Sequence, residues 1–469
     1  MSVTFRIKAS EAYGRRLDPH FHSPTFRMNR SCIESHRHLA MKGLCELSNE
    51  IWDKAQCFQD CFPYVEIGVI NCENGEIGGI EELVTAEAPS RAQMVVRAGD
   101  LLVSATRPTR NAIAIVPLDV EKAIASTGFL VVRDVQSTLV APKYLFHALR
   151  MEFCTKQFDQ YSSGGNYPAI TKEDFRKIII PLPSLSEQRK IVAELDAAYA
   201  AKRAADERAA KLLASIDDMV LKELGIANLP TPDTSLSSRI FTVPAREALN
   251  DRFDAHYNQN FFRDLADLIR EDKRCCRLGS VGTFVRGVTY KSEDEAECGH
   301  AILRANNVSL EEFDLDLSDL VYVSSDLAFS PAQQIKDGDI LICAASGSKE
   351  HAGKVAYVRN APDDTYIGGF MMVLRTDAGV NPEYVAVYMQ SSIFRGLIFR
   401  HLGGTNINNV SLELLNKLPL ILPDAAMQNG IASKASSIRA EARKLKADAT
   451  AALDAAKRKI EEELMIKEN

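Results

Sequence analysis

Apolar residues along the chain form two kinds of pattern, and each pattern occurs twice. One is a long run with apolar residues at alternating spacings of four and three, which predicts a long helix with a packing seam. The other is a set of short apolar runs bounded by Gly, Pro, Asn and Asp, which predicts the strands and short helices of a mixed α/β domain. The chain is therefore expected to fold as domain, helix, domain, helix.

The first long helix is predicted from Ser184 to about Leu224, a stretch that contains neither Gly nor Pro. Ser184 and Glu187 have the spacing of a capping box at its start, and Gly225 ends it. The second helix runs from Asp424 to the end of the sequence.

The two helices have matching seams. In the second helix the seam is Ile431, Ala435, Ile438, Ala442, Leu445, Ala449, Ala452 and Ala456, and in the first it is Ile191, Leu195, Ala198, Lys202, Ala205, Ala209, Leu212 and Ile216. Helices of about 40 residues span roughly 60 Å. We expect them to pack antiparallel as a coiled coil; the alternative is two separate helices in solvent.

The globular segments repeat at a nearly constant offset of 239 or 240 residues. The matches are Gly99–Leu102 with Gly338–Leu341, Pro142 and Tyr144 with Pro382 and Tyr384, Gly164–Gly165 with Gly403–Gly404, Pro183 and Gln188 with Pro423 and Gln428, and Arg16–Phe21 with Arg252–Tyr257. So constant a spacing predicts two equivalent domains related by an internal pseudo-twofold.

Each copy is predicted to be mixed α/β. In the first, strands are expected at 64–70, 100–104, 111–117, 128–133 and 178–181 and a helix at 141–158. In the second, strands are expected at 302–308, 339–343, 353–359, 369–375 and 418–422 and a helix at 382–399. The predicted domains are 1–183 and 240–423, with spacer helices at 184–226 and 424–469 and a Pro/Thr/Ser-rich linker at 227–239.

Composition changes this picture little. The 469 residues are 46% hydrophobic and 25% charged, as in ordinary globular proteins. No apolar run reaches the length of a membrane span and no secretory signal is visible, so a cytoplasmic protein is expected. The ten cysteines form no C-x-x-C pair. Reduced thiols are the default expectation, with a zinc site around Cys57, Cys61, His36 and His38 as a minor alternative.

Charge argues against a protein that coats nucleic acid through a general basic surface. The net charge is −7. Residues 1–180 carry 21 basic and 21 acidic residues, whereas residues 240–423 carry 18 and 25. Any affinity for DNA must therefore come from local patches.

Signatures of catalysis are missing. Residues 347–354 resemble a phosphate-binding loop, but the spacing is one residue too long and Val355 stands where Ser or Thr is required. H-E-x-x-H, G-x-S-x-G, G-x-G-x-x-G and the Asn/Asp-Pro-Pro-aromatic box of amino-methyltransferases are absent. Trp52 is expected to be a packing residue. The chain is predicted to recognise a ligand rather than to react with it.

Polar loops occur at matching places in the two copies. The first copy has residues 106–111 and 162–167, and the second has residues 346–354 and 403–408. Arg, Lys, Asn and Ser are the residues that contact phosphates and base edges, and Gly-Gly-Asn lets a backbone approach a ligand closely. Solvated strand connections and ordinary turns are the alternative interpretation.

A family resemblance rests on the segment that opens the first helix, Pro181-Leu182-Pro183-Ser184-Leu185-Ser186-Glu187-Gln188. It is similar to the Pro-Leu-Pro-x-x-x-Glu-Gln signature of the specificity subunits of type I restriction–modification enzymes. The Arg-x-Asp-x-His-aromatic starts and the twofold order also resemble this family, over essentially the whole chain. The second copy departs from the signature, with Met427 in place of Glu.

The resemblance implies two target recognition domains, each reading one half of a split double-stranded DNA sequence, with the helices setting the number of unread bases between them. It implies a non-catalytic chain without a cofactor of its own. Two methyltransferase subunits would dock on it and supply S-adenosylmethionine chemistry on adenine, and motor-nuclease subunits would join them to cut unmodified DNA.

Candidate contacts follow from the loops and from the signature. The candidate DNA contacts are Arg107, Arg110, Asn111, Asn166, Tyr167, Ser346, Ser348, Lys349, Lys354, Thr405 and Asn406. The candidate partner contacts are Gln188, Arg189 and Gln428. Two alternatives stay open: a solitary two-armed DNA-binding protein without methyltransferase partners, and an enzyme, such as a nuclease, whose scattered carboxylates form no visible motif.

Overall fold

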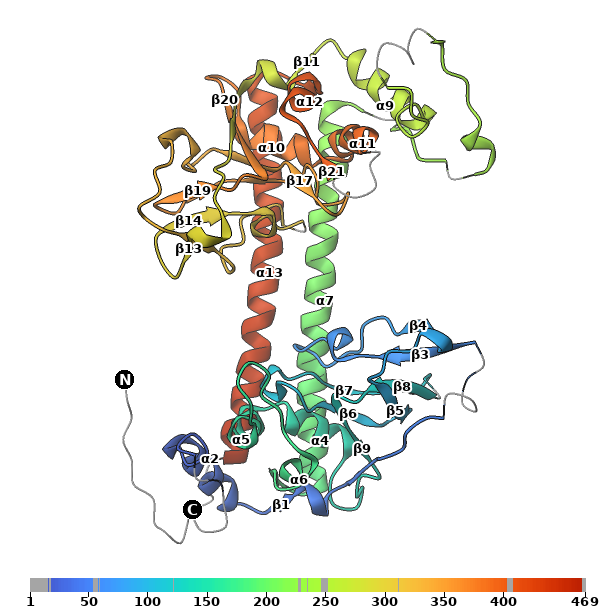
Figure 1. Ribbon diagram of the computed structural model, residues 1–469, viewed down its shortest axis with the longest axis vertical. Helices are drawn as coiled ribbons and strands as arrows, with labels where there is room; N and C mark the ends of the chain where they lie inside the picture. The colour runs from blue at the N-terminus through green and yellow to red at the C-terminus, as the bar shows by residue number, and fades with distance from the viewer. Residues whose placement is uncertain are drawn as a thin grey trace. The chain divides into compact units, whose positions relative to one another are not determined.

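A computed structural model describes residues 16, 18–53, 58, 60–120, 122–226, 229–233, 235–245, 252–310, 312–402 and 408–465, except the side chains of residues 239 and 408. The chain forms two compact units (Figure 1). The first comprises Met1–Ala204 and Ala447–Asn469, and the second comprises Ala205–Lys446. The units divide the chain inside both long helices, so the domain limits expected from the sequence stay a prediction.

The described part of the first unit contains short strands, 3-10 turns and four short helices besides its parts of the long helices. Its helices are α2 (Pro24–Glu34), α4 (Pro142–Leu149), α5 (Glu152–Tyr161) and α6 (Lys172–Phe175). Its strands are β1 (His38–Ala40), β2 (Glu46–Leu47), β3 (Cys61–Val65), β4 (Glu81–Val84), β5 (Ala92–Arg97), β6 (Leu101–Ser104), β7 (Ile113–Ile115), β8 (Lys122–Ser126), β9 (Phe129–Arg133) and β10 (Ile179–Pro181).

Two four-stranded sheets form the body of this unit. Their strand orders are β2-β9-β6-β7 and β4-β3-β8-β5, and β1 pairs separately with β10. Only the β3–β8 pairing is parallel; the other strand pairs are antiparallel. Strands β6 and β9 are buried on both faces, because the helices cover one side of their sheet and the second sheet packs against the other.

The second unit repeats this plan. Its short helices are α9 (Asn260–Arg270), α10 (Pro382–Gln390), α11 (Ser392–His401) and α12 (Leu412–Lys417). Its strands are β11 (Cys275–Arg277), β12 (Gly282–Arg286), β13 (Glu295–Ala296), β14 (His300–Leu303), β15 (Val321–Val323), β16 (Ile340–Cys343), β17 (Ala345–Ser346), β18 (Val355–Tyr357), β19 (Thr365–Ile367), β20 (Met371–Thr376), β21 (Asn408–Asn409) and β22 (Pro419–Ile421).

The sheets of the second unit correspond to those of the first. Their orders are β12-β20-β16-β18 and β13-β15-β14-β19, with the separate pairs β11-β22 and β17-β21. The β14–β19 pairing is parallel, like its counterpart β3–β8. The predicted tandem repeat of one mixed α/β fold is therefore confirmed.

The two long helices, α7 (Leu185–Leu224) and α13 (Ala425–Met465), each contribute to both units. In the first unit Ile191 and Leu195 share a core with Ile460 and Leu464, so the start of α7 lies against the end of α13. In the second unit the order is reversed, and Lys434 of α13 forms an ion pair with Glu223 of α7 at 2.6 Å. The predicted antiparallel pairing is confirmed within each unit.

The seam agrees with the prediction over most of both helices. Every predicted seam residue of α7 is buried or half-buried. In α13 the prediction is wrong at Ala452, which is exposed, whereas Leu453 is buried. A straight helix drifts by about 20° per heptad relative to a strict seven-residue repeat, so after several heptads the buried position moves by one residue.

Capping hydrogen bonds define where each long helix begins. Ser184 and Glu187 form the predicted capping box: the Ser184 backbone N–H donates to the Glu187 carboxylate at 2.8 Å, and the Glu187 N–H donates to Ser184 Oγ at 3.3 Å. In the second copy Asp424 alone fills this role and accepts from the Met427 N–H at 2.9 Å. Because Met427 stands where the signature has Glu, the second helix lacks the bond from the cap residue's N–H to a glutamate carboxylate and keeps only the other of the two capping bonds.

Three corrections concern the globular copies. The single helices predicted at 141–158 and 382–399 are each two helices, with a break at Arg150–Met151 and at Ser391. The strand predicted at 64–70 is β3, which ends at Val65 and continues as a 3-10 turn. Likewise, the strand predicted at 302–308 is β14, which ends at Leu303. No described helix is long and apolar enough to cross a membrane.

Candidate nucleic-acid interface

Both units share the same set of polar contacts. In the first, Arg16 Nε donates to Asp18 at 2.8 Å, and Asp18 accepts from the Phe21 N–H. Arg252 and Asp254 repeat the pair at 2.8 Å in the second unit, and Asp254 accepts from the Tyr257 N–H. Burial opposes ionisation of both carboxyls, but the hydrogen bonds dominate and lower the pKa of Asp18 and of Asp254.

A second duplicated pair joins an arginine of a sheet strand to the aspartate that precedes a neighbouring strand. Arg133 Nε donates to Asp100 at 2.9 Å, and Arg375 Nε donates to Asp339 at 2.8 Å. The hydrogen bond to the aspartate raises the pKa of each arginine above its ordinary value. These two aspartates are the acidic residues of the repeated Gly-Asp motif, so the motif has a structural role in both copies.

The glutamines of the repeated Pro-x-x-x-x-Gln motif are buried rather than exposed. Gln188 accepts from the Ala141 N–H at 2.8 Å and donates to the carbonyl oxygens of Leu139 and Pro183, both at 3.0 Å. The prediction that this side chain contacts a partner is therefore wrong, because its polar groups are already used inside the unit.

Gln428 has the same role in the second unit. It accepts from the Asn381 N–H at 2.9 Å and donates to the Pro423 carbonyl at 2.7 Å. The prediction of a partner contact is wrong here for the same reason. Arg189 is exposed and stays a candidate.

The two predicted loops of the first copy lie side by side. Thr106 and Ser163 both form bridges with Ala169, and the Arg107 N–H donates to the Pro168 carbonyl at 2.6 Å. The Arg107 guanidinium donates to the Asn166 carbonyl and lies 4.3 Å from the ring centroid of Tyr167. Segments about 60 residues apart thus form one surface.

Three side chains of this surface are exposed. Arg110 is exposed, and Tyr167 is 70% exposed although Arg107 covers one of its faces. Asn166 is exposed as well. A cation, an aromatic ring and an amide in one place can contact a phosphate, stack on a base and hydrogen-bond a base edge.

Asn111 has a different role from the predicted one. Its backbone is left-handed, with φ of 67°, and ends the short turn Pro108–Arg110, which Arg107 precedes with φ of 49°. Its Nδ2 donates to the Arg150 carbonyl at 2.9 Å, and its Oδ1 is buried. The predicted DNA contact from Asn111 is therefore corrected to a turn-forming role.

The two predicted loops of the second copy also meet. Ser346 pairs with Asn408, and Ala345 pairs with Asn409, as strands β17 and β21. Ser348 and Lys349 are exposed at the end of the first loop, and Ser346 is half-buried. Thr405 and Asn406 lie outside the residues that the structure describes.

The prediction that Lys354 contacts DNA is also wrong. Only 3% of its surface is exposed, and its Nζ donates to the Val308 carbonyl at 2.7 Å. Burial lowers the pKa of its ammonium group. A lysine in this position holds two segments of the unit together and cannot reach a phosphate.

Arginines that the sequence did not single out hold the loops in place. Arg150 donates to the carbonyl oxygens of Asn111, Ile113, Cys72 and Glu73. Arg395 donates to the carbonyl oxygens of Glu350 and Ala352. Both lie in or beside predicted helices, so their sequence pattern gave no sign that they support loops.

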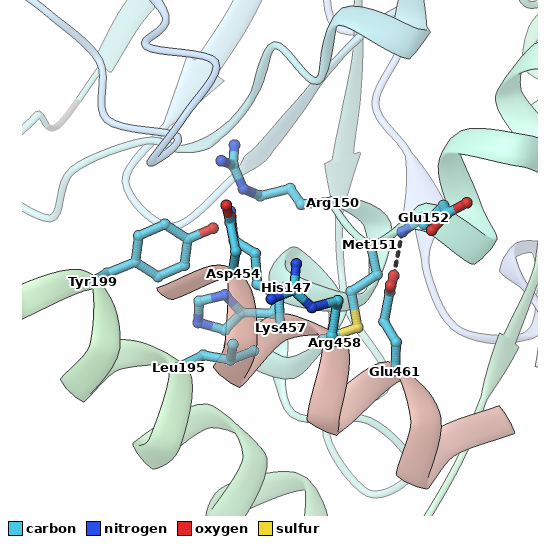
Figure 2. Close-up of a pocket in the computed structure, with 10 residues that line it drawn as sticks. All are labelled: His147, Arg150, Met151, Glu152, Leu195, Tyr199, Asp454, Lys457, Arg458 and Glu461. Atoms are coloured by element: carbon cyan, nitrogen blue, oxygen red, sulfur yellow. Dashed lines mark hydrogen bonds between the residues drawn. The ribbon is translucent and has the colours of Figure 1, made fainter. Parts of the chain in front are cut away.

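A small pocket marks where the end of α13 meets the first unit (Figure 2). Its volume is about 210 Å³, and residues from α4, α5, α7 and α13 line it. Glu461 accepts the backbone N–H of Glu152 at the first turn of α5, and burial raises the pKa of the Glu461 carboxyl. The His147 ring stacks on Tyr199 at 5.8 Å.

The second unit has a corresponding contact. Asp217 of α7 accepts the N–H of Ser392, at the first turn of α11, at 2.8 Å. In each unit, therefore, a carboxylate on a long helix satisfies a free backbone N–H of a short helix. These contacts hold the long helices against the globular parts and leave the loops described above as the candidate interface. No cluster of His, Cys, Asp and Glu among the described residues could hold a metal ion.

Comparisons with known proteins match part of the chain to one family. Residues 39–211 match the family model described as type I restriction modification DNA specificity domain. Over 174 residues the chain is 34% identical to the type I restriction enzyme StySPI specificity subunit of Salmonella potsdam and 33% identical to the EcoKI specificity subunit of Escherichia coli strain K12. Each match covers 36% of this chain and 37% of the relative, so little more than a third of each relative is spanned.

Among solved structures, the HsdS subunit from Thermoanaerobacter tengcongensis resembles the chain over 97% of this chain and 99% of that one, with 22% identity and a TM-score of 0.38. The family-model match runs from Leu39 in β1 to Lys211 in α7 and includes the Pro-Leu-Pro signature just before that helix. The resemblance of this chain to the specificity subunits of type I restriction–modification enzymes is therefore confirmed.

Proposed function

We propose that this chain is the DNA-recognition component of a type I restriction–modification complex and that each unit reads one half of a bipartite target. The observation that carries the proposal is the repeated pair of loops. In both units the loop after the Gly-Asp strand meets the loop after the second short helix, on a scaffold with the same buried contacts. Two similar reading surfaces fit a target in two halves.

In the first unit we assign the DNA contacts to Arg110, Asn166 and Tyr167, with Arg107 acting mainly to position the loop through its bonds to Asn166. In the second unit we assign them to Ser346, Ser348 and Lys349, together with Thr405 and Asn406. Each surface has at least one exposed cation for phosphates and several polar groups for base edges.

The long helices are proposed to set the number of unread base pairs and to carry the partners. We place partner contacts on their exposed faces, beginning with Arg189. Two methyltransferase subunits, which bring S-adenosylmethionine, and motor-nuclease subunits are the proposed partners, and the assembly would act in the cytoplasm. The net charge of −7 agrees with this division, because the partners can supply much of the phosphate contact.

The competing function is a solitary two-armed DNA-binding protein. Purification of the tagged chain from its native host, with quantification of every protein that accompanies it, separates the two. A methyltransferase at about two copies per chain is the expected result. A well-expressed chain that arrives alone contradicts the complex and favours the solitary protein. An Arg189→Ala chain, compared with the unmodified one, tests whether this exposed helix face contributes.

A further inference from the structure

The two units differ at one place on their reading surfaces. In both units, the strand that follows the parallel strand pair begins beside the loop after the Gly-Asp strand. Phe129 pairs with Ser104 in the first unit and Met371 pairs with Cys343 in the second, so Phe129 and Met371 occupy equivalent positions. Gly128 of the first unit therefore corresponds to Phe370 of the second. The hydrogen bonds agree, since the Gly128 carbonyl accepts from Ala105 and the Phe370 carbonyl accepts from Ala344, both at 2.8 Å.

In the first unit a side chain at this position would require the Ile67 side chain to move. A Cβ atom added to Gly128 would lie 2.7 Å from Ile67 Cδ1. In the second unit the 3-10 turn that contains Ile67 is replaced by Ala305–Asn307, which starts with a small residue. The ring of Phe370 is 72% exposed, although Phe is usually buried. The exposed ring is thus a feature of the second unit alone.

A cavity opens beside this ring. Its volume is about 690 Å³, which is within the usual range of small-molecule pockets. Tyr290 and Phe370 supply aromatic surface, and Gly368 and Gly369 supply bare backbone. A Cβ at Gly368 would lie 2.9 Å from the Leu303 carbonyl oxygen, so glycine is needed for the strands to approach this closely.

Polar and charged side chains line the same cavity. Arg304 Nε is buried and has no hydrogen-bond partner among the described residues. Its guanidinium forms an ion pair with Asp319, with 3.6 Å between Nη2 and the carboxylate oxygen. Glu295 and Asn306 also line the cavity. A donor, a carboxylate acceptor and an amide beside two aromatic rings match the edge and the faces of a nucleobase.

We propose that this cavity receives one unstacked nucleobase of the bound DNA, with Phe370 as the ring on which it stacks. Ala345, which lines the cavity, belongs to strand β17 of the proposed reading surface, and its N–H donates to the Phe370 carbonyl. A base displaced at that surface is therefore next to the cavity. Glu295 disfavours a phosphate group, so the base and not the backbone enters. The inference rests on the proposed function and adds a base-binding site to one half of the interface.

The test uses the full chain and four labelled duplexes, each with a single bulged A, C, G or T, beside the fully paired duplex. A bulge presents a base that is already unstacked, which removes the energy needed to displace it. We expect about tenfold tighter binding to at least one bulged duplex, as base–aromatic stacking implies. Phe370→Ala should remove this preference, and Phe370→Trp should retain it.

The matched control is Phe253→Ala, which removes another exposed phenylalanine of the same unit, 82% exposed and outside the cavity. It should leave the preference unchanged. A preference for no bulge, or one that survives Phe370→Ala, overturns the proposal. Failure to bind the paired duplex, with the bulge preference intact, instead contradicts the proposed function.

Discussion

The buried glutamines give the sharpest test of the duplicated scaffold. Gln188→Ala removes three hydrogen bonds and Gln428→Ala removes two. At about 1 kcal/mol per bond, the free energy of unfolding should fall by about 3 kcal/mol in the first unit and by about 2 kcal/mol in the second. The loss should be confined to stability, since neither side chain reaches the surface.

The only tryptophan makes the measurement specific to one unit. Trp52 is buried in the first unit, where its Nε1 donates to the Ala92 carbonyl at 2.7 Å. Its fluorescence during urea unfolding therefore reports that unit, whereas circular dichroism reports both. Gln188→Ala should lower the midpoint of the fluorescence transition by roughly 1–2 M urea, given typical denaturant slopes. Gln428→Ala should shift the circular dichroism signal more than the fluorescence.

Arg189→Ala is the matched control, because Arg189 is the exposed neighbour of Gln188. A surface substitution of this kind should change the stability by less than about 0.5 kcal/mol. If Gln188→Ala leaves the fluorescence midpoint unchanged while it abolishes co-purification of a methyltransferase, the structural role is refuted and the glutamine is a partner contact after all.

Three further predictions concern the reading surfaces, pH and the helices. Arg110→Ala should relax or weaken recognition of one half of the methylated motif, and Lys349→Ala should do the same for the other half. Sequencing of methylated DNA measures both effects, and equal effects on both halves would count against two separate reading units. The pKa of Asp18 and of Asp254 is lowered in the folded chain, so the stability that these carboxylates contribute is complete above about pH 4 and is lost as the pH falls through the folded pKa. The thermal unfolding temperature of Asp254→Asn should therefore depend less on pH between about 2 and 4 than that of the unmodified chain. An unchanged pH dependence would show that Asp254 does not contribute this stability. Seven residues inserted into each long helix add about 10 Å, or about three base pairs, so the unread gap should change; the same gap in the methylated motif contradicts the spacing role.

Much of the fold is predictable from the sequence because the repeat reveals it twice. The seams of the long helices predict their pairing, and Ser184 with Glu187 predicts where the first begins. Strands β5 and β8 are missed, because Ala92–Arg97 and Lys122–Ser126 show no clear alternation of apolar and polar residues. Strands that are buried on both faces lose the period of two on which prediction depends.

The candidate site is predictable as loops but not residue by residue. Pattern alone cannot tell an exposed lysine from Lys354, whose ammonium group reaches a carbonyl oxygen more than 40 residues away. Asn111 and Gln188 mislead for the same reason, since their partners are backbone groups of distant segments. Phe370 misleads in the opposite direction, because an apolar residue at the start of a buried strand is expected in the core.

One chain is proposed to read both halves of one DNA target. The most direct measurement is the sequence of the methylated motif in the native host, compared with that in a strain that lacks this chain. The methylated motif is expected to have two specified parts, separated by a fixed number of unread bases, and to disappear when the chain is absent. A continuous motif, or methylation that persists without the chain, would contradict this proposal.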